Sequence, residues 1–280
     1  MMKVALIGAG GKMGCRITDH LKDHPDYSIR YVECSERGIA NLAARGVQPL
    51  PQEEAVRDAD AVILAVPDKL LGNVARQVVP QMKAGAMLIT LDPAAAYAGE
   101  LPTRPDISIF VTHPCHPSVF EYEEDPEARA DFFGGVKAKM PIVCALMQGP
   151  DADYAKGEKM ARDFFAPVTR SHRITVEQMA MLEPAMAETV GIALIMALRE
   201  ALEEVVRRGV PREAAEDFLY GHIKVPLGIA FERVNFPFSD GAKLIADYGR
   251  RQVLQPDWKK VFEPDNVKAQ VRAIVEGKTA

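Results

Sequence analysis

The sequence predicts an α/β protein in which a doubly wound parallel sheet is followed by an all-α C-terminal domain. Three observations support this fold class. A glycine-rich loop follows the first apolar strand, short apolar strands alternate with helical patterns in the first half, and the second half is mostly helical in pattern. Strands that alternate with helices at this spacing are typical of βαβ units and a parallel sheet.

The order of apolar patterns places the expected elements. Strands are expected at Lys3–Ile7, Ser28–Glu33, Ala61–Val66, Met87–Leu91, Ile107–Thr112 and Ile142–Met147. Helices are expected at Gly14–Asp23, Gly38–Arg45, Leu70–Met82, Asp151–Phe165, Val176–Arg208, Arg212–Leu219 and Val267–Val275. The nearly continuous apolar run of the third strand suits a strand that is covered on both faces. We therefore expect one domain over residues 1–172 and a helical domain over residues 173–280.

Composition excludes several classes of partner. The chain has 280 residues and a formal net charge of -5, which disfavours a phosphate backbone or an anionic membrane as a partner. Its four cysteines form no CxxC pair, and no secretory leader is expected, so a reducing cytoplasm fits best. The longest apolar run, Val190–Leu198, has nine residues against the roughly 20 that a bilayer span needs. We expect a cytoplasmic protein without a membrane segment.

The strongest motif is a glycine loop between the first strand and the first helix. It reads Gly8, Ala9, Gly10, Gly11, Lys12, Met13 and Gly14. Glycines at this turn let the backbone approach a diphosphate, and the helix N-terminus offers free N–H groups and a positive dipole end. The spacing is a variant, because Met13 stands at the sixth position of a strict GxGxxG. With a strand before it and a helix after it, the loop predicts a dinucleotide-binding Rossmann domain.

Residues beyond the loop bear on the choice of cofactor. Glu33 lies 19 positions after Gly14, at the end of the next strand, where a carboxylate accepts bonds from ribose hydroxyls and favours NAD. Ser35 and Arg37 follow it and leave the 2′-phosphate of NADP as the alternative. Pro67 and Asp68 end the third strand at the edge where such sheets bind ligands. We therefore also expect these two residues to flank the cofactor.

Two histidines follow a later strand at the same edge. His113 and His116 each precede a proline, which favours extended or polyproline-II backbone, in which residues three apart share a face. Both imidazoles are then expected in one cleft. This pair suits metal ligation or proton transfer, whereas a rigid loop with one buried histidine is the structural alternative.

The long predicted helix carries two carboxylates among apolar neighbours. Glu183 and Glu188 are five residues apart, which is about 140° on an α-helix, so they are not expected to share a face. Pro184 is expected to bend the helix. A carboxylate on an apolar helix is costly to bury unless it is paired or ligated, so one of the two is a site candidate. The alternative is a solvated edge or an ion pair with Arg173 or Arg199.

The helical half offers two further polar candidates and an expected contact surface. His222 and Lys224 supply a base and a cation for a carboxylate substrate, although each taken singly fits a surface or core role. The stretch Val190–Leu198 has apolar residues on every side, and such a helix is buried. In a chain of this size we expect a homodimer to bury it.

Taken together, these residues resemble the 6-phosphogluconate dehydrogenase-like superfamily. The resemblance rests on the glycine loop, on Ala65-Val66-Pro67-Asp68 and on a Rossmann half followed by a helical half. More narrowly, the His113–Ser118 stretch, the segment Met181-Leu182-Glu183-Pro184-Ala185 and the length look like the D-apionate oxidoisomerases. That resemblance implies NAD-dependent oxidation of a branched sugar acid with a carbon shift, giving 3-oxo-isoapionate.

The implied chemistry assigns roles to the candidates. A divalent cation, zinc as the first expectation, would acidify the tertiary alcohol and polarise the ketone, with His113, His116 and Glu183 as ligands. His116, Glu188, His222 and Lys224 are then the candidates for the base or for binding the substrate carboxylate. Two alternatives remain, a simple dehydrogenase or imine reductase of the same superfamily without a metal, and a nucleotide-sensing protein without turnover.

Overall fold

The computed structural model describes residues 1–278, which form two compact units. Met1–Pro184 and the C-terminal segment from Val267 form the first, here called the sheet unit, and Ala185–Asn266 form the second, the helical unit. The sheet unit therefore runs past the boundary expected after residue 172. The reason is that Val176 and Met179, which follow the last strand, are buried in the core of the sheet.

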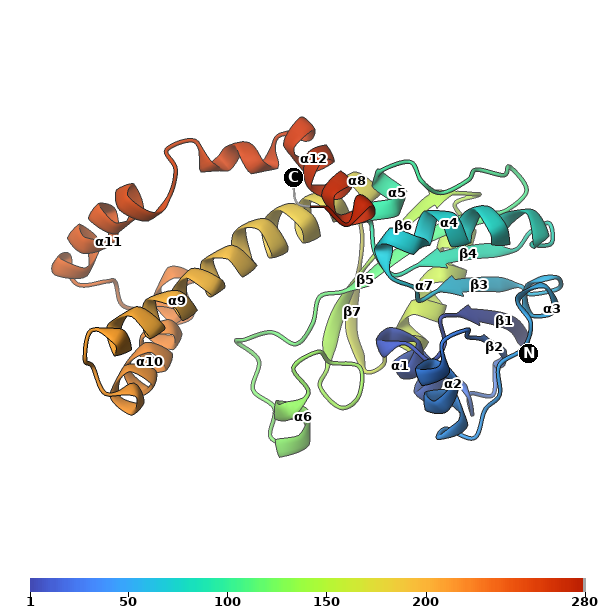
Figure 1. Cartoon of the computed structure of the whole chain (residues 1–280), viewed down its shortest axis with the longest axis horizontal. Helices are drawn as coiled ribbons and strands as arrows, with labels where there is room; N and C mark the ends of the chain where they lie inside the picture. Colours follow the sequence, from blue (N-terminus) through green and yellow to red (C-terminus); the bar gives the residue numbers. More distant parts are fainter. Residues whose placement is uncertain (279–280) are drawn as a thin grey trace. The chain divides into compact units, whose positions relative to one another are not determined.

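Seven strands form one sheet in the order β2-β1-β3-β4-β5-β6-β7 (Figure 1). They are β1 (Met2–Ile7), β2 (Tyr27–Val32), β3 (Ala61–Leu64), β4 (Met87–Thr90), β5 (Ser108–Pro114), β6 (Met140–Gln148) and β7 (Val168–Arg173). Strands β1 to β5 are parallel, which confirms the predicted parallel sheet in this part. Strand β6 is antiparallel to β5 and β7 is parallel to β6, so the last two strands run the opposite way.

Helices cover both faces of this sheet. They are α1 (Lys12–Leu21), α2 (Glu36–Ala43), α3 (Gln52–Val56), α4 (Asp68–Val78), α5 (Ala94–Tyr97), α7 (Asp153–Phe164) and α8 (Val176–Ala180). The sequence also forms α6 (Pro126–Ala130) in the loop after β5 and α12 (Pro264–Glu276) near the C-terminus. Val4 and Leu6 of β1 lie in the core beneath α1, α2 and α7, and Ala5 and Ile7 lie in the core beneath α3, α4, α5 and α8. The period-2 alternation of a strand thus supplies two cores, as a doubly wound sheet requires.

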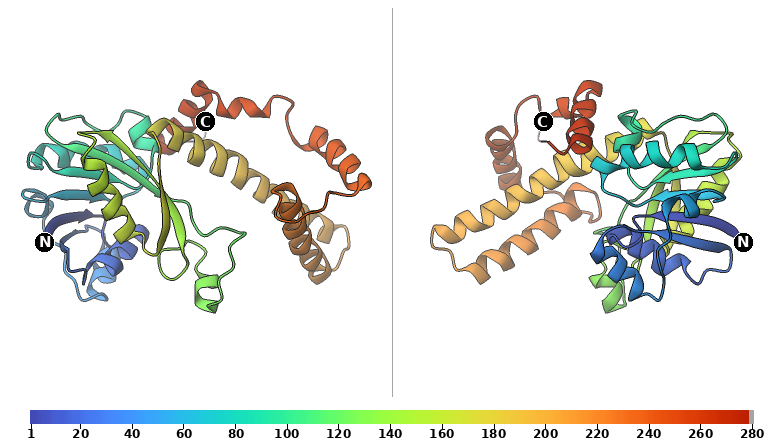
Figure 2. Two further views of the ribbon diagram at one scale, coloured as in Figure 1. Left: turned by 180° about the vertical axis from the view of Figure 1, so that it is seen from behind. Right: turned by 45° about the vertical axis from the view of Figure 1, so that its right-hand side comes forward.

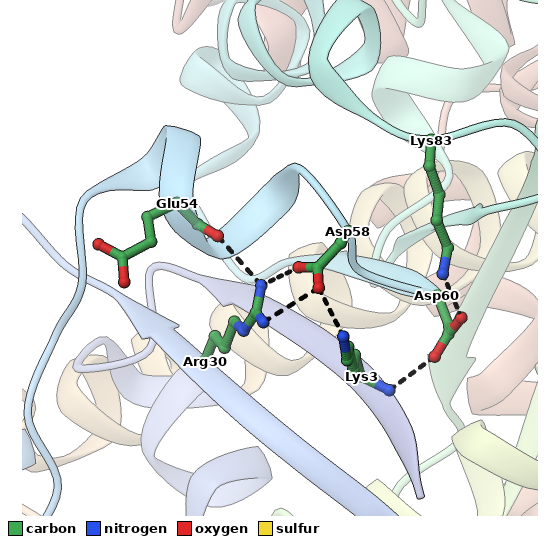
Figure 3. Close-up of polar contacts among 6 residues, drawn as sticks. All are labelled: Lys3, Arg30, Glu54, Asp58, Asp60 and Lys83. Carbon is green, nitrogen blue, oxygen red and sulfur yellow. Dashed lines mark hydrogen bonds and ion pairs between the residues drawn. The ribbon is translucent and has the colours of Figure 1, made fainter.

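An ion-pair network ties the amino-terminal edge of the sheet together (Figure 3). The Asp58 carboxylate pairs with Arg30 and, at 2.6 Å, with Lys3. Asp60 accepts the backbone N–H of Lys3 at 2.8 Å and pairs with Lys83 at 2.6 Å. The guanidinium of Arg30 and the ammonium of Lys3 hold the pKa of Asp58 well below its usual range. These groups are substantially exposed, so each ion pair contributes little to the free energy of unfolding. The network lies at the end of the sheet opposite to the edge where such sheets bind ligands.

The helical unit contains α9 (Ala193–Arg207), α10 (Arg212–Ala230) and α11 (Asp240–Val253). Helices α9 and α10 lie side by side (Figure 2), and Arg212 pairs with Glu203 across them at 2.6 Å. As the sequence predicts, α9 ends just before Gly209, which adopts a φ of 101° that favours glycine. Before α9 the same helix is π-helical over Met181–Ile192, with Pro184 inside it.

The continuous helix Val176–Arg207 also bears on the membrane question. Among the described residues it is the one helix that is long and apolar enough, by length and composition, to cross a membrane. Only 11% of its most apolar window is buried. The expectation of no membrane segment considers only runs without any charge, whereas the 18-residue window here allows up to two charged residues. Exposed apolar surface of this kind is typical of contact sites.

The close packing of the glycine loop gives the first prediction. A Cβ atom on Gly14 would lie 2.0 Å from the carbonyl oxygen of Gly8 and 2.6 Å from the carbonyl carbon of Ala9, and both atoms belong to backbone. Since this backbone cannot yield without moving β1 or α1, Gly14→Ala is expected to lower the free energy of unfolding by about 1–3 kcal/mol. Urea denaturation measures this change.

The matched control is Gly72→Ala, also in a helix of the sheet unit. There the nearest atoms, Cβ and Oε2 of Glu100, lie at 3.0 Å, so a shift of a few tenths of an ångström relieves the contact. Added helix propensity is expected to leave that variant within about 1 kcal/mol of the wild type. Equal stability of the two variants would contradict the packing argument.

Candidate active site

The glycine loop lies at the carboxyl end of β1 and leads directly into α1. Gly8 has a φ of 77°, and a Cβ atom there would lie 2.5 Å from the carbonyl oxygen of Ala65. On Gly10 it would lie 2.2 Å from the carbonyl oxygen of Gly38. A pocket of about 400 Å³ adjoins the loop and is lined by Gly10, Gly11, Lys12, Cys15, Ser35, Arg37, Gly38 and Asn41. The loop thus presents backbone and the N-terminus of α1 to a pocket, as a diphosphate site requires.

Glu33 fixes this loop to the end of β2. Its Oε2 accepts the N–H of Gly10 at 2.9 Å, and its Oε1 accepts the N–H groups of Cys34 and Ser35 and the Ser35 hydroxyl, each at 2.9 Å. Although burial opposes the charge, these hydrogen bonds lower the pKa of Glu33. The carboxylate is therefore charged and oriented, and Oε2 keeps a lone pair for a ribose hydroxyl.

A cluster of one imidazole and two carboxylates forms the centre of the site. Asp92 follows β4, His113 lies near the end of β5, and Glu183 lies in the first turn of the π-helical stretch. One ligand atom from each lies within 4.8 Å of the other two. His113 Nε2 is 3.0 Å from Glu183 Oε1, and its Nδ1 donates to the carbonyl oxygen of Leu91 at 2.8 Å. Metal-binding histidines are commonly oriented by such a bond from the second ring nitrogen.

The cluster perturbs its own titrations. Burial opposes the charged imidazole, but the hydrogen bond that it donates to Glu183 and the charges of Glu183 and Asp92 raise the pKa of His113 to about 9. Burial and the charge of Glu183 raise the pKa of Asp92 to about 6. Burial and the charge of Asp92 raise the pKa of Asp68 to about 6. The site therefore holds more acidic groups than one imidazolium can neutralise, a condition that a divalent cation relieves.

His116 is the expected metal ligand that lies outside this cluster. Its φ is 61°, so the backbone is left-handed and the three-residue period of polyproline II does not apply. The two histidine rings are still neighbours, with centroids 6.1 Å apart. His116 Nδ1 is 2.8 Å from the carbonyl oxygen of Phe133, which can only accept, so Nδ1 carries the proton. Burial lowers the pKa of His116, which leaves a neutral ring with a lone pair on Nε2.

The other candidates fall in two places. Pro67 precedes α4 and Asp68 opens it, at the same edge as the cluster. Glu188, His222 and Lys224 belong to the helical unit, so their roles stay predictions. The 140° argument against Glu188 sharing a face with Glu183 is wrong for this stretch, because a π-helix has i→i+5 hydrogen bonds and a longer turn.

Sequence reasoning missed Asp92, although a signal was present. Leu91 and Asp92 directly follow the buried run Met87–Thr90, which ends at the same edge as the third strand and the histidine strand. Ligands bind at the carboxyl ends of the strands in such sheets, so Asp92 is a site candidate for the same reason as Asp68.

Comparison with known proteins first defines a class. Residues 121–275 match the family model described as phosphogluconate dehydrogenase (decarboxylating) C-term, and residues 3–93 match the model described as NADP oxidoreductase coenzyme F420-dependent. A solved structure from Cupriavidus necator, described as a semialdehyde dehydrogenase NAD-binding protein in complex with calcium and NAD, superposes with a TM-score of 0.95. The two chains are 46% identical, with 98% and 99% of them covered. The chain is an NAD-dependent oxidoreductase of the phosphogluconate dehydrogenase class.

Curated relatives narrow this class to a family. A D-apionate oxidoisomerase from Rhizobium rhizogenes is 47% identical over 275 residues, which cover 98% of this chain and 100% of the relative. A second, from Cupriavidus necator, is 46% identical over 273 residues, covering 97% and 99%. The chain belongs to the D-apionate oxidoisomerase family, as the narrower resemblance predicts.

The ion pair between His113 and Glu183 gives the second prediction. In Glu183→Gln the imidazole loses its hydrogen-bonded carboxylate, so the pKa of His113 is expected to fall from about 9 toward the ordinary range. An NMR titration of the His113 ring in chelator-treated protein measures it. The raised pKa stabilises the folded chain fully below about pH 6.5, and this contribution is lost as the pH rises through about 9.

A control on the same helical segment is Glu177→Gln. The Glu177 carboxylate interacts with Thr175 and lies outside the cluster. That variant is expected to leave the His113 titration unchanged. A His113 pKa that stays near 9 in Glu183→Gln would show that another group supports the imidazolium.

Proposed function

We propose that this chain is a D-apionate oxidoisomerase, which oxidises D-apionate with NAD and shifts one carbon group to give 3-oxo-isoapionate. The observation that carries the proposal is the cluster of Asp92, His113 and Glu183 at the sheet edge, found in a chain that matches oxidoisomerases over almost its whole length. A simple dehydrogenase or imine reductase has less use for three such ligands beside a separate neutral histidine.

The glycine loop and Glu33 hold the cofactor in this proposal. The N–H groups at the start of α1 and the Lys12 ammonium face the diphosphate, and the Glu33 carboxylate receives a ribose hydroxyl. Pro67 and Asp68 border the path toward the nicotinamide end. When bound, NAD supplies the hydride acceptor for the secondary alcohol of the substrate.

His116 is the proposed base. Because its Nδ1–H is held by the Phe133 carbonyl oxygen, the Nε2 lone pair is available to accept a hydroxyl proton. Its lowered pKa keeps the ring neutral near pH 7, the form that a base needs. The carbon shift requires a second deprotonation, at the tertiary alcohol beside the new ketone. The ring can accept this proton once it has released the first one to solvent, and it then returns the proton to the alkoxide that the shift leaves at the former ketone.

Asp92, His113 and Glu183 fit a divalent cation. Glu183 Oε2 is buried with no hydrogen-bond partner among the described residues, which is an orphaned acceptor of the kind a cation satisfies. One imidazole nitrogen with two carboxylate oxygens suits zinc as well as harder ions such as Mn²⁺. When bound, such an ion supplies Lewis acidity to the ketone and the neighbouring alcohol.

The third prediction tests the activity itself. Purified protein incubated with NAD and D-apionate is expected to produce NADH and a rearranged product whose carbon skeleton is 3-oxo-isoapionate. Cofactor absorbance follows the first step and NMR of the product identifies the skeleton. Metal analysis and a chelator titration accompany the assay, together with Asp92→Asn, which removes one ligand and is expected to abolish rearrangement.

The outcomes separate the candidate functions. An unrearranged keto acid, formed equally well in metal-free protein, would identify a simple dehydrogenase. NAD binding without turnover on any sugar acid would favour a nucleotide-sensing protein. The control Asp106→Asn removes a carboxylate that pairs with Arg104, away from the cluster, and is expected to keep activity.

We also propose that the protein is a cytoplasmic homodimer whose helical unit provides the contact. That unit has almost no core of its own, because α9 buries Leu202, α10 buries Ala215 and α11 buries none of its side chains. An apolar pocket of about 470 Å³ between α9 and α10 includes the 66% exposed Phe218. A second copy of this surface supplies the missing apolar partner for the helix Val176–Arg207 as well.

The fourth prediction concerns this contact. Light scattering on a sizing column is expected to give twice the chain mass of 30.7 kDa. Phe218→Asp places a charge in the apolar pocket and is expected to shift the species toward the monomer. Phe132→Asp makes the same change at an 83% exposed residue of the sheet unit and is expected to stay dimeric. A monomeric wild type, or recovery in the membrane fraction, would contradict the proposal.

A further inference from the structure

A short loop, residues 131–138 and here called the Phe133 loop, rests against the first helix. The Asp131 carboxylate holds its shape by accepting the N–H groups of Val136, Lys137 and Ala138 at 3.0, 3.0 and 3.2 Å. Gly134 and Gly135 both have positive φ values, of 69° and 75°, so the loop makes a turn that favours glycine.

Side chains of α1 fasten this loop beside the nucleotide pocket. Arg16 pairs with Asp131 at 3.7 Å, and the His20 ring contacts the carbonyl oxygen of Gly135. The carbonyl oxygen of Phe133 also accepts the bond from His116. The loop is therefore held by α1 on one side and by the histidine strand on the other.

The Phe133 ring faces the charged side of α1. The Lys12 ammonium lies 3.4 Å from the ring centroid, and the Arg16 guanidinium carbon lies 5.2 Å from it. Lys12 also lines the pocket beside the glycine loop. Within residues 1–278 no carboxylate forms an ion pair with Lys12. An aromatic face attracts an ammonium without cancelling its charge, so the full positive charge stays available to an anion in the pocket.

We propose that Phe133 is a positioning residue for the cofactor, whose ring holds the Lys12 ammonium beside the glycine loop for the NAD diphosphate. The inference rests on the proposed function, because it needs the diphosphate at this loop. It adds a contact from a segment that follows β5, far from the nucleotide motif in sequence. The ring acts through Lys12, so its removal weakens binding of the cofactor and leaves the chemistry at His116 in place.

A double-mutant cycle tests the inference. NAD affinity of the full-length protein is measured by calorimetry, without substrate, for the wild type, Phe133→Leu, Lys12→Met and the double variant. Phe133→Leu is expected to raise the Kd for NAD about two- to fivefold, the range of an exposed cation–π contact. In the Lys12→Met background the same change is expected to have no further effect, since the ring then has no ammonium to hold.

Two more variants separate positioning from a general packing role. Phe133→Tyr keeps an aromatic face and is expected to restore the wild-type Kd, and Phe132→Leu, at the exposed neighbouring position, is expected to leave it unchanged. In the steady state Phe133→Leu is expected to raise KM for NAD with kcat within about twofold of the wild type, because the backbone carbonyl that orients His116 remains.

The results overturn the inference in distinct ways. Equal weakening by Phe133→Leu in both backgrounds, or a wild-type Kd in Phe133→Leu, would show that the ring does not act through Lys12. A wild type that fails to bind NAD would instead refute the proposed function. If the NAD affinities follow the expected double-mutant cycle but the protein does not turn over D-apionate, the positioning role stands and only the proposed substrate is rejected.

Discussion

The site depends on the parallel pairing of four neighbouring strands, because this pairing brings four separate chain segments to one edge. In the observed register Ile7 pairs with Leu64, Leu64 with Thr90, and Thr90 with Val111. The glycine loop, Asp68, Asp92 and His113 therefore leave the sheet beside one another. A slip of one residue in β5 would turn the His113 side chain to the other face of the sheet. The helices and cores on both faces hold this register in place.

The electrostatics of the edge show a site that is built for more positive charge than the chain provides. Asp92 and Asp68 have pKa values raised to about 6, and His113 keeps its proton because two carboxylates surround it. Partly buried carboxylates are costly unless they are paired or ligated. A few ångströms away, His116 has the opposite property, a lowered pKa that leaves it neutral. Without a cation, the end of β5 thus holds an imidazolium at His113, whose Nε2 proton a bound metal would replace, and a neutral imidazole at His116 that can take a proton.

Much of the fold followed from the sequence because its signals were local. The glycine loop, the apolar run of β3 and the basic, glycine-terminated end of α9 are each contained in a short segment, and the structure has each in place. β7 (Val168–Arg173) was missed because its pattern is polar, with no fully buried residue. α11 was missed because it buries no side chain, so no apolar stripe marks it against a core.

The candidate site was harder to predict than the fold, because its residues come from distant segments that only the folded sheet brings together. His113 and Glu183 were expected together and lie 3.0 Å apart, but His116 was expected on the strength of a three-residue period that its left-handed backbone does not follow. Asp92 lies in the cluster because β4 is the neighbour of β5 in the sheet. The order of strands in a sheet cannot be read from a single sequence. Phe133 contributes through a cation–π contact across a loop, and such a contact leaves no pattern along the chain.

The path of the chain between its two units has a consequence for how they are linked. The chain leaves the sheet unit after Pro184 and returns to it at Val267, where α12 buries Val267 and Val271. The helical unit is thus an insertion between two parts of one core, and cutting a single connection would leave it tethered by the other. Helix α12 belongs to the sheet unit, which also contains the glycine loop. Removing α12 would therefore expose apolar surface in the unit that the N-terminal half of the chain forms.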